Sequence, residues 1–307
     1  MLNDSDVSTP ASVIAYESPY LADSMTAGRM NTSADALLAN IQHAVRLGHP
    51  QMRTWPTRPD RVCLVGSGPS LADTLDELRR AQWEGAHIVT LNGSYHWCIE
   101  HGIKPDTQIV MDARASNARF VSPAVPGCRY VLASQCSPET WAAVADRPDV
   151  WVWHAVVAKD DPISAFLTDY YRGHWFGVGG GTTVATRALM LLRMAGYVRF
   201  DLFGVDCCWM GDTHHAMPQP ENDRDSRMTI RVGDAERPET MREFQVAPWH
   251  LKQFEDFCAV LKLNGQNLIA TVHGDGLLAY MLRTLGNSES SALSVPSSES
   301  FALDKEK

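Results

Sequence analysis

The sequence predicts an α/β protein with a Rossmann-like, open and mostly parallel sheet, helices on both faces and a lid-like insertion. From Arg61 onward, short apolar runs alternate with helical runs, which is the pattern of parallel strands joined by crossover helices. Almost every apolar run is followed by a polar residue or a glycine, and open sheets bind ligands at the carboxyl ends of their strands. The predicted strands span residues 62–65, 88–91, 108–111, 130–133, 150–153, 200–203 and 267–272.

The composition is typical of a soluble globular protein. Of the 307 residues 45% are hydrophobic and 21% are charged, and the net charge of −9 argues against a dedicated nucleic-acid binder. No apolar run approaches the length of a membrane helix, and the start of the chain lacks the features of a signal peptide. We therefore expect a cytoplasmic protein, without membrane association, that acts on small molecules. The composition leaves a homo-oligomer open.

The chain divides into three parts by composition. Residues 1–33 are polar and unpatterned and are predicted to be a mobile arm, and residues 287–307 are predicted to be a disordered tail rich in Ser and acidic residues. Residues 34–286 form a single predicted domain, opened by an amphipathic helix at 34–47. An insertion at about 207–250 is the predicted lid.

A glycine turn after the first strand is the strongest site signal. Glycines allow a ligand to approach the backbone, and the proline suits the first position of a helix, whose free N–H groups attract phosphate. Leu71 stands where a dinucleotide fingerprint needs its third glycine, and no P-loop is present, so the site is of neither type. An ordinary tight turn is the alternative. The predicted nucleotide-binding residues are Gly66, Ser67, Gly68, Pro69 and Ser70.

Further nucleotide contacts are predicted at other strand ends. A second glycine cluster precedes the predicted helix 184–195 and is a candidate for another anion site, with a hinge as the alternative. Asn92 is suited to a base edge or ribose because it can donate and accept hydrogen bonds. The remaining candidates are Ser134, Gln135, Gly180, Gly181, Thr182 and Thr183.

Two aspartates end apolar strands and are predicted to be catalytic and to bind metal. Asp112 and Asp206 each supply the kind of oxygen that Mg²⁺ prefers, and a helix N-cap is the alternative for Asp112. With both carboxylates in one crevice, a metal would neutralise charge on a transferring phosphoryl group.

Histidines are the candidates for proton transfer. His214 is the predicted general base on the lid, with His154 and His273 as rivals. A zinc site formed by Cys207, Cys208, His214 and His215 is the alternative, although neighbouring residues rarely converge on one ion.

The ordered motifs resemble the MptE-like 6-hydroxymethylpterin diphosphokinase family. The motifs are Gly66–Leu71, Asn92, Gly102–Asp106, Asp112, Gly179–Val184 and Phe203–Asp206. That family is related to the motility accessory factors of flagellin glycosylation, and the first turn is also similar to that of CMP-sialic-acid sialyltransferases. The layout resembles short members carried by phages, for which the location would be the host cytoplasm. The 207–249 segment departs from the family archetype.

The resemblance implies a nucleotide-dependent transferase. Its leading form is a Mg²⁺-dependent diphosphokinase that uses ATP and a hydroxyl-bearing acceptor similar to 6-hydroxymethylpterin, with Gly66–Ser70 on the phosphates and the metal near Asp112 and Asp206. A glycosyltransferase that uses a nucleotide sugar, such as a CMP-sugar, is the first alternative. A non-catalytic nucleotide-binding module is the second.

Overall fold

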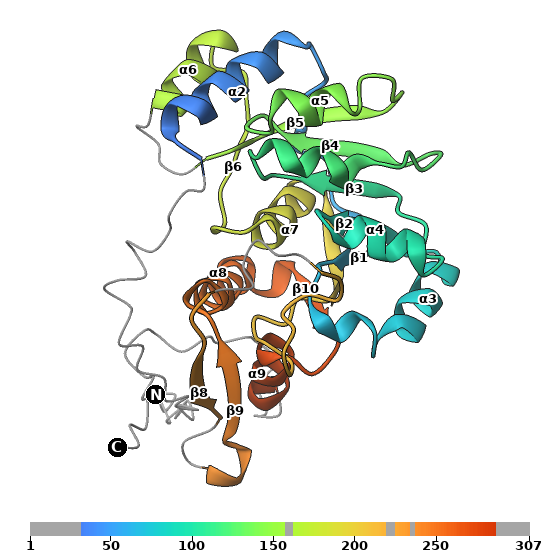
Figure 1. The fold of residues 1–307 in the computed structure, drawn as a ribbon, viewed down its shortest axis with the longest axis vertical. Helices are drawn as coiled ribbons and strands as arrows, with labels where there is room; N and C mark the ends of the chain where they lie inside the picture. Colours follow the sequence, from blue (N-terminus) through green and yellow to red (C-terminus); the bar gives the residue numbers. More distant parts are fainter. Residues whose placement is uncertain (1–31, 157–161, 219–224, 234–236, 287–307) are drawn as a thin grey trace, which may run out of the picture.

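The computed structural model describes residues 32–156, 162–218, 225–233 and 237–286. Eight strands form one sheet in the order β10-β7-β1-β2-β3-β4-β5-β6, and all neighbouring strands are parallel, which confirms the predicted fold class (Figure 1). The strands are β1 (Arg58–Val65), β2 (His87–Leu91), β3 (Thr107–Val110), β4 (Arg129–Ala133), β5 (Val150–Ala155), β6 (Gly177–Val178), β7 (Tyr197–Phe203) and β10 (Ile269–Val272).

Helices cover both faces of the sheet because both faces of its strands are apolar. In β1, Val62 and Leu64 join one buried cluster, while Cys63 and Val65 join another, as the alternation of a strand requires. The second cluster lies under α3 and α4, and the first lies under α7 and α8. The helices are α2 (Ala34–Arg46), α3 (Leu75–Trp83), α4 (Ser94–Glu100), α5 (Pro138–Ala142), α6 (Pro162–Tyr170), α7 (Val184–Met194), α8 (Pro248–Asn264) and α9 (Leu277–Gly286), with short 3₁₀ helices between them.

The direction of winding reverses between β1 and β7. The chain passes from β1 through β2, β3, β4 and β5 to β6, and α7 then returns it to β7, on the other side of β1. In open α/β sheets the loops beyond the carboxyl ends of two such strands diverge and leave a crevice. We call the region beyond the carboxyl ends of β1 and β7 the switch point.

A separate hairpin lies within the predicted insertion. Strands β8 (Met228–Val232) and β9 (Arg242–Val246) are antiparallel, and their apolar residues point to one buried face. Figure 1 shows the hairpin beside α8 and α9, and the rings of Phe244 and Tyr280 lie 5.5 Å apart. These two strands were not predicted from the sequence.

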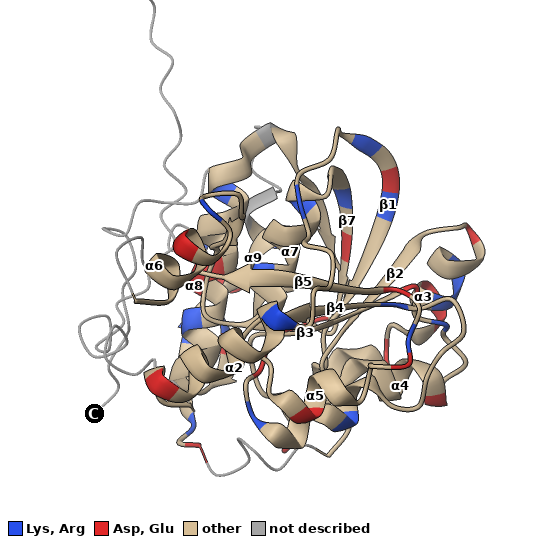
Figure 2. Cartoon of the chain, turned by 90° about the horizontal axis from the view of Figure 1, so that it is seen from above, with Lys and Arg blue, Asp and Glu red and all other residues tan. Residues whose placement is uncertain are grey.

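The predicted arm and tail fall almost entirely outside the described residues, which begin at Thr32 and end at Gly286. Basic and acidic residues are interspersed along the ribbon in Figure 2. Of the helices described, none is both long and apolar enough to cross a membrane.

Candidate functional site at the switch point

The first glycine turn packs directly against the turn that follows β7. The Gly68 N–H donates to the Gly204 carbonyl at 2.8 Å, and the Ser70 N–H donates to the Asp206 carboxylate at 3.0 Å. A Cβ on Gly66 would overlap the Gly204 carbonyl oxygen, and one on Gly68 would overlap the Asp206 carboxylate. The two glycines are therefore needed for contact between the turns. Three of the amides predicted to bind phosphate, those of Gly66, Gly68 and Ser70, already have acceptors.

The helix predicted to start at this turn begins later. Pro69–Leu71 form one 3₁₀ turn, and α3 starts only at Leu75, so the proline does not open the α-helix as predicted. The dipole of α3 is consequently displaced from the turn. Ser67 remains accessible, since it is partly exposed and its N–H forms no hydrogen bond within the described part of the chain.

Asp206 is a buried carboxylate at the centre of the switch point. Its side chain is held by Ser70, and its Oδ1 atom has no hydrogen-bond partner among the described residues. Burial raises the pKa of Asp206, although hydrogen bonds from Ser70 oppose the rise.

The second glycine turn also receives a carboxylate from the protein. The Thr182 N–H and hydroxyl both donate to Asp256 of α8, at 2.7 and 2.9 Å, and Lys252 pairs with the same carboxylate. Thr183 caps α7 through its hydroxyl. As at the first turn, an internal carboxylate lies where an external anion was predicted.

Cys207 is a buried residue of the turn that follows β7. Asp206 precedes it, and burial together with the charges of neighbouring groups, Asp206 and Asp256 among them, raises the pKa of the Cys207 thiol well above its usual value. The second glycine turn follows β6, at the edge of the sheet, and contacts α8 through Asp256.

The segment around His214 reaches the first turn from the predicted lid. The Ala216 N–H donates to the Ser67 carbonyl at 2.8 Å. His214 is only 4% exposed, and its ring lies 4.1 Å from that of Trp209. Its backbone is thus beside the switch point, while its imidazole is packed among aromatic rings.

Asp112 is engaged by a neighbouring arginine. Arg114 donates from its Nε and Nη2 atoms to the Asp112 carboxylate, the latter at 2.5 Å. Asp112 follows β3, whereas Asp206 follows β7, and β1 and β2 lie between them. Three strand spacings amount to roughly 14 Å.

These positions do not fit one shared Mg²⁺ ion. A bound Mg²⁺ needs its ligands about 2.1 Å away, so carboxylates on such distant strands cannot both ligate it. Among the residues that the structure describes, no group of three or more His, Cys, Asp or Glu side chains could hold a metal ion. The predicted metal pair, Asp112 and Asp206, is therefore not supported, and neither is the zinc alternative.

The polar residues that end β2, β4 and β5 are tied into the sheet. Ser134 Oγ lies 2.9 Å from the Nδ1 atom of His154, and the Gln135 amide donates to the Met111 carbonyl. Burial lowers the pKa of His154 to about 4. Asn92 has a φ of 47° and a buried Oδ1 atom without a hydrogen-bond partner among the described residues.

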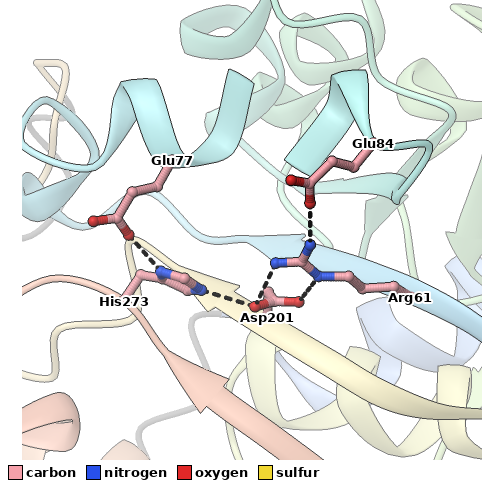
Figure 3. Close-up of polar contacts among 5 residues, drawn as sticks. All are labelled: Arg61, Glu77, Glu84, Asp201 and His273. Carbon is pink, nitrogen blue, oxygen red and sulfur yellow. Dashed lines mark hydrogen bonds and ion pairs between the residues drawn. The ribbon is translucent and has the colours of Figure 1, made fainter. Parts of the chain in front are cut away.

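His273 belongs to a charged network and not to an open site. Its ring nitrogens lie 2.6 Å from Glu77 and 2.8 Å from Asp201, and Arg61 joins Asp201 to Glu84 (Figure 3). Two carboxylates accept from both nitrogens only when the ring is protonated. Burial opposes the charge, yet these hydrogen bonds raise the pKa of His273.

Two arginines at the switch point were not predicted. Arg283 donates to the Gly274 carbonyl and pairs with Asp275, and Arg242 pairs with the same aspartate. Gly274 packs so closely on Ser70 that an added Cβ would lie 2.5 Å from the Ser70 hydroxyl. Both guanidinium groups are partly exposed. They follow no glycine motif, so the sequence offered little signal for them.

Comparison with known proteins places this arrangement in a family. The profile described as "6-hydroxymethylpterin diphosphokinase MptE-like" matches residues 35–212, more than half of the chain. The chain belongs to the MptE-like family. This confirms the family that the motifs indicated. No curated protein sequence matches this MptE-like chain significantly.

Solved structures show the same fold. A Maf glycosyltransferase from Magnetospirillum magneticum AMB-1 matches with a TM-score of 0.57 and 15% identity, over 90% of this MptE-like chain and 46% of its own. The chain thus spans about half the length of that glycosyltransferase. A mammalian sialyltransferase in complex with Gal-beta-1-3GalNAc-ortho-nitrophenol matches at a TM-score of 0.33 and 12% identity, over 66% and 77% of the two chains. At these identities the first similarity shows the fold alone, and the second score supports no conclusion.

Proposed function

We propose that this protein is a nucleotide-dependent transferase whose donor phosphates bind at the switch point. The observation that carries the proposal is the contact between the Gly66–Ser70 turn and the turn that follows β7, at the point where the sheet reverses its winding. Membership of the MptE-like family supports a nucleotide donor.

The phosphates would contact the groups that the turns leave accessible. The Ser67 N–H is one donor, and Arg242 and Arg283 can exchange their half-exposed pairing with Asp275 for pairing with phosphate. Arginines would then supply the positive charge that transfer of a charged group requires. We route no step through Asp112 or Asp206.

The leading reaction is diphosphate transfer from ATP. A hydroxyl oxygen of the acceptor would attack the β-phosphorus of ATP and break its bond to the α-phosphate oxygen. The products are the acceptor diphosphate, AMP and the proton of the hydroxyl. We propose that the acceptor, a small molecule with a hydroxyl group, enters beside the 207–250 segment, because Ala216 of that segment lies on Ser67.

Transfer of a sugar from a nucleotide sugar is the second candidate. It is favoured by the extent of the match to the Maf glycosyltransferase, which covers 90% of the chain, whereas the family profile ends at residue 212. In that reaction the acceptor oxygen would replace the nucleotide at the anomeric carbon and release the free nucleotide.

A ligand screen by thermal shift separates the candidates. A stabilising ligand at about 100 times its Kd adds roughly 2.7 kcal/mol to the free energy of unfolding, enough for a clear rise in Tm. Stabilisation by ATP and AMP, followed by AMP release with a hydroxyl acceptor, would support the diphosphokinase. Stabilisation by CMP or UDP derivatives only would support the glycosyltransferase. No stabilisation by any nucleotide would overturn the proposal.

A matched pair of arginine variants tests the location. Arg283→Gln should weaken binding of the stabilising nucleotide about tenfold, because a charge-assisted contact to phosphate is lost. Arg80→Gln, on the exposed surface of α3, removes the same charge away from the switch point and should leave the Kd unchanged. Equal Kd values for the two variants would contradict the proposed location.

A further inference from the structure

A cavity lies at the opposite edge of the sheet from the switch point. It has a volume of about 260 Å³ and opens among the first residues of β1, β2, β4 and β7. The candidate site lies beyond the carboxyl ends of the same parallel strands, so the two regions are separated by the length of the sheet. The floor of the cavity is largely apolar and includes Ile109, Val131, Leu191, Leu192 and Ala195.

Aromatic rings form the walls of this cavity. Trp55 and Trp151 meet edge to face with their ring centroids 6.0 Å apart. His87 and Tyr197 stack at 5.8 Å with an interplanar angle of 25°. Walls of this kind favour a flat ring system, because aromatic groups pack best in offset-stacked or edge-to-face arrangements.

Three arginines lie at the rim, and each guanidinium group is placed over an aromatic ring. The distances to the ring centroids are 5.5 Å for Arg53 over Trp55, 4.7 Å for Arg58 over Tyr197 and 5.4 Å for Arg129 over Trp151. Stacking on a ring holds a planar guanidinium in place while its N–H groups remain available at its edges.

Two of the rim arginines are paired with partly exposed carboxylates. Arg58 pairs with Asp60 at 3.3 Å and Arg129 pairs with Asp149 at 2.9 Å, both with partly exposed side chains. Arg53 has no carboxylate partner within the described ranges. Because exposed ion pairs contribute little free energy, a ligand anion can compete for these arginines.

We propose that this cavity binds a planar organic anion, with its ring system between the aromatic walls and its carboxylate or phosphate on the arginine rim. Arginine recognises both groups through paired N–H donors. The volume is slightly below the roughly 300 Å³ at which pockets for drug-sized ligands begin, so it suits one or two fused rings. The ligand is distinct from the donor nucleotide at the switch point.

Isothermal titration calorimetry of the full chain with 2-naphthoate tests the proposal. Two matched probes isolate its parts, since 2-naphthamide keeps the rings without the charge and cyclohexanecarboxylate keeps the charge without the flat rings. We expect 2-naphthoate to bind about tenfold more tightly than either, the difference that one charge-assisted contact or one aromatic contact provides. Equal affinity for the three probes, or no binding of 2-naphthoate, would overturn the proposal.

A pair of arginine variants locates the site. Arg53→Gln should weaken 2-naphthoate binding about fivefold or more, while Arg79→Gln, an exposed arginine on α3, should not change it. Arg53 is exposed, so both variants should keep the wild-type Tm. Neither variant should change the response to nucleotides. Displacement of 2-naphthoate by the donor nucleotide would contradict a separate site, and an unchanged Kd in Arg53→Gln would contradict this one.

Discussion

At the residue scale, Asp206 is unusual because it carries a carboxylate into a buried position where no described cation pairs with it. The Ser70 N–H donates to Oδ2, and Oδ1 has no described hydrogen-bond partner. A buried carboxylate that accepts an amide hydrogen bond resembles an internal substitute for a bound anion. We therefore expect the hydrogen-bond acceptor of Asp206 to contribute more to the stability of the turn than its negative charge does.

Two substitutions at Asp206 separate these contributions. Asp206→Asn keeps an acceptor for the Ser70 N–H and should be at least as stable as the wild type at pH 7. Asp206→Ala removes the acceptor and should lower the free energy of unfolding by about 2 kcal/mol. Urea unfolding at pH 7 measures both. A loss in Asp206→Asn as large as that in Asp206→Ala would contradict this account.

Asp206→Asn should also change how the free energy of unfolding depends on pH. The pKa of Asp206 is raised in the folded state, so this group's stabilisation is complete below about 3.8 and is lost as pH rises through the folded pKa. Asp206→Asn should remove that decline from the curve of unfolding free energy against pH. An identical curve for wild type and variant would show that the carboxyl group is not perturbed.

The sequence predicted the residues of this turn but not their pairing. Gly66–Ser70 and Asp206 were all proposed to bind a ligand, because glycines and a carboxylate at strand ends are typical of ligand sites. The bond between Ser70 and Asp206 spans 136 positions and depends on β1 and β7 being neighbours. Local patterns carry no information on that adjacency.

At the element scale, the network of Figure 3 joins β1, β7 and α3 to His273, the residue that follows β10. Arg61 and His273 both bond to Asp201, and although burial opposes ionisation, their hydrogen bonds lower the pKa of Asp201 to about 2. The lowered pKa of Asp201 stabilises the fold at higher pH, whereas the raised pKa of His273 stabilises it at lower pH. Its contribution is complete below about 6.5 and is lost as pH rises through the folded pKa.

Thermal unfolding between pH 6 and pH 9 tests this contribution. The wild-type Tm should fall across this range, and His273→Asn should flatten the decline. His87→Asn is a matched control, because burial lowers the pKa of His87 and its effect on stability belongs to pH values below about 6.5. If the Tm of His273→Asn fell as much as that of the wild type, the decline would not originate from His273.

The seven predicted strands match β1–β5, β7 and β10 to within a few residues, because buried parallel strands are continuous apolar runs. β6 has two residues and gives no such run. The hairpin was missed although Met228–Val232 alternates apolar and polar residues. The segment that contains it was interpreted only as a lid-like insertion.

At the scale of the whole molecule, the folded domain extends further along the chain than the region that the family profile matches. The profile ends at residue 212, but α8 and β10 lie beyond it. Phe254, Phe257 and Leu261 of α8 are buried in the same cluster as the sheet. The sheet thus needs the C-terminal third of the chain to cover one face.

A chain shortened to residues 1–212 should therefore lack a cooperative thermal transition, since the apolar face under α8 would be exposed. Calorimetry beside the full chain checks this. Phe257→Ala in the full chain should melt cooperatively with a loss of about 3 kcal/mol. A shortened chain that melts at the wild-type Tm would show that α8 and β10 are dispensable for folding.

The most direct test of the account is a crystal structure grown with the nucleotide that gives the largest thermal shift. We expect phosphate density beyond the carboxyl ends of β1 and β7, next to the Ser67 N–H and within reach of Arg283. Phosphate density at the amino edge of the sheet, or at Asp112 beyond β3, would contradict it.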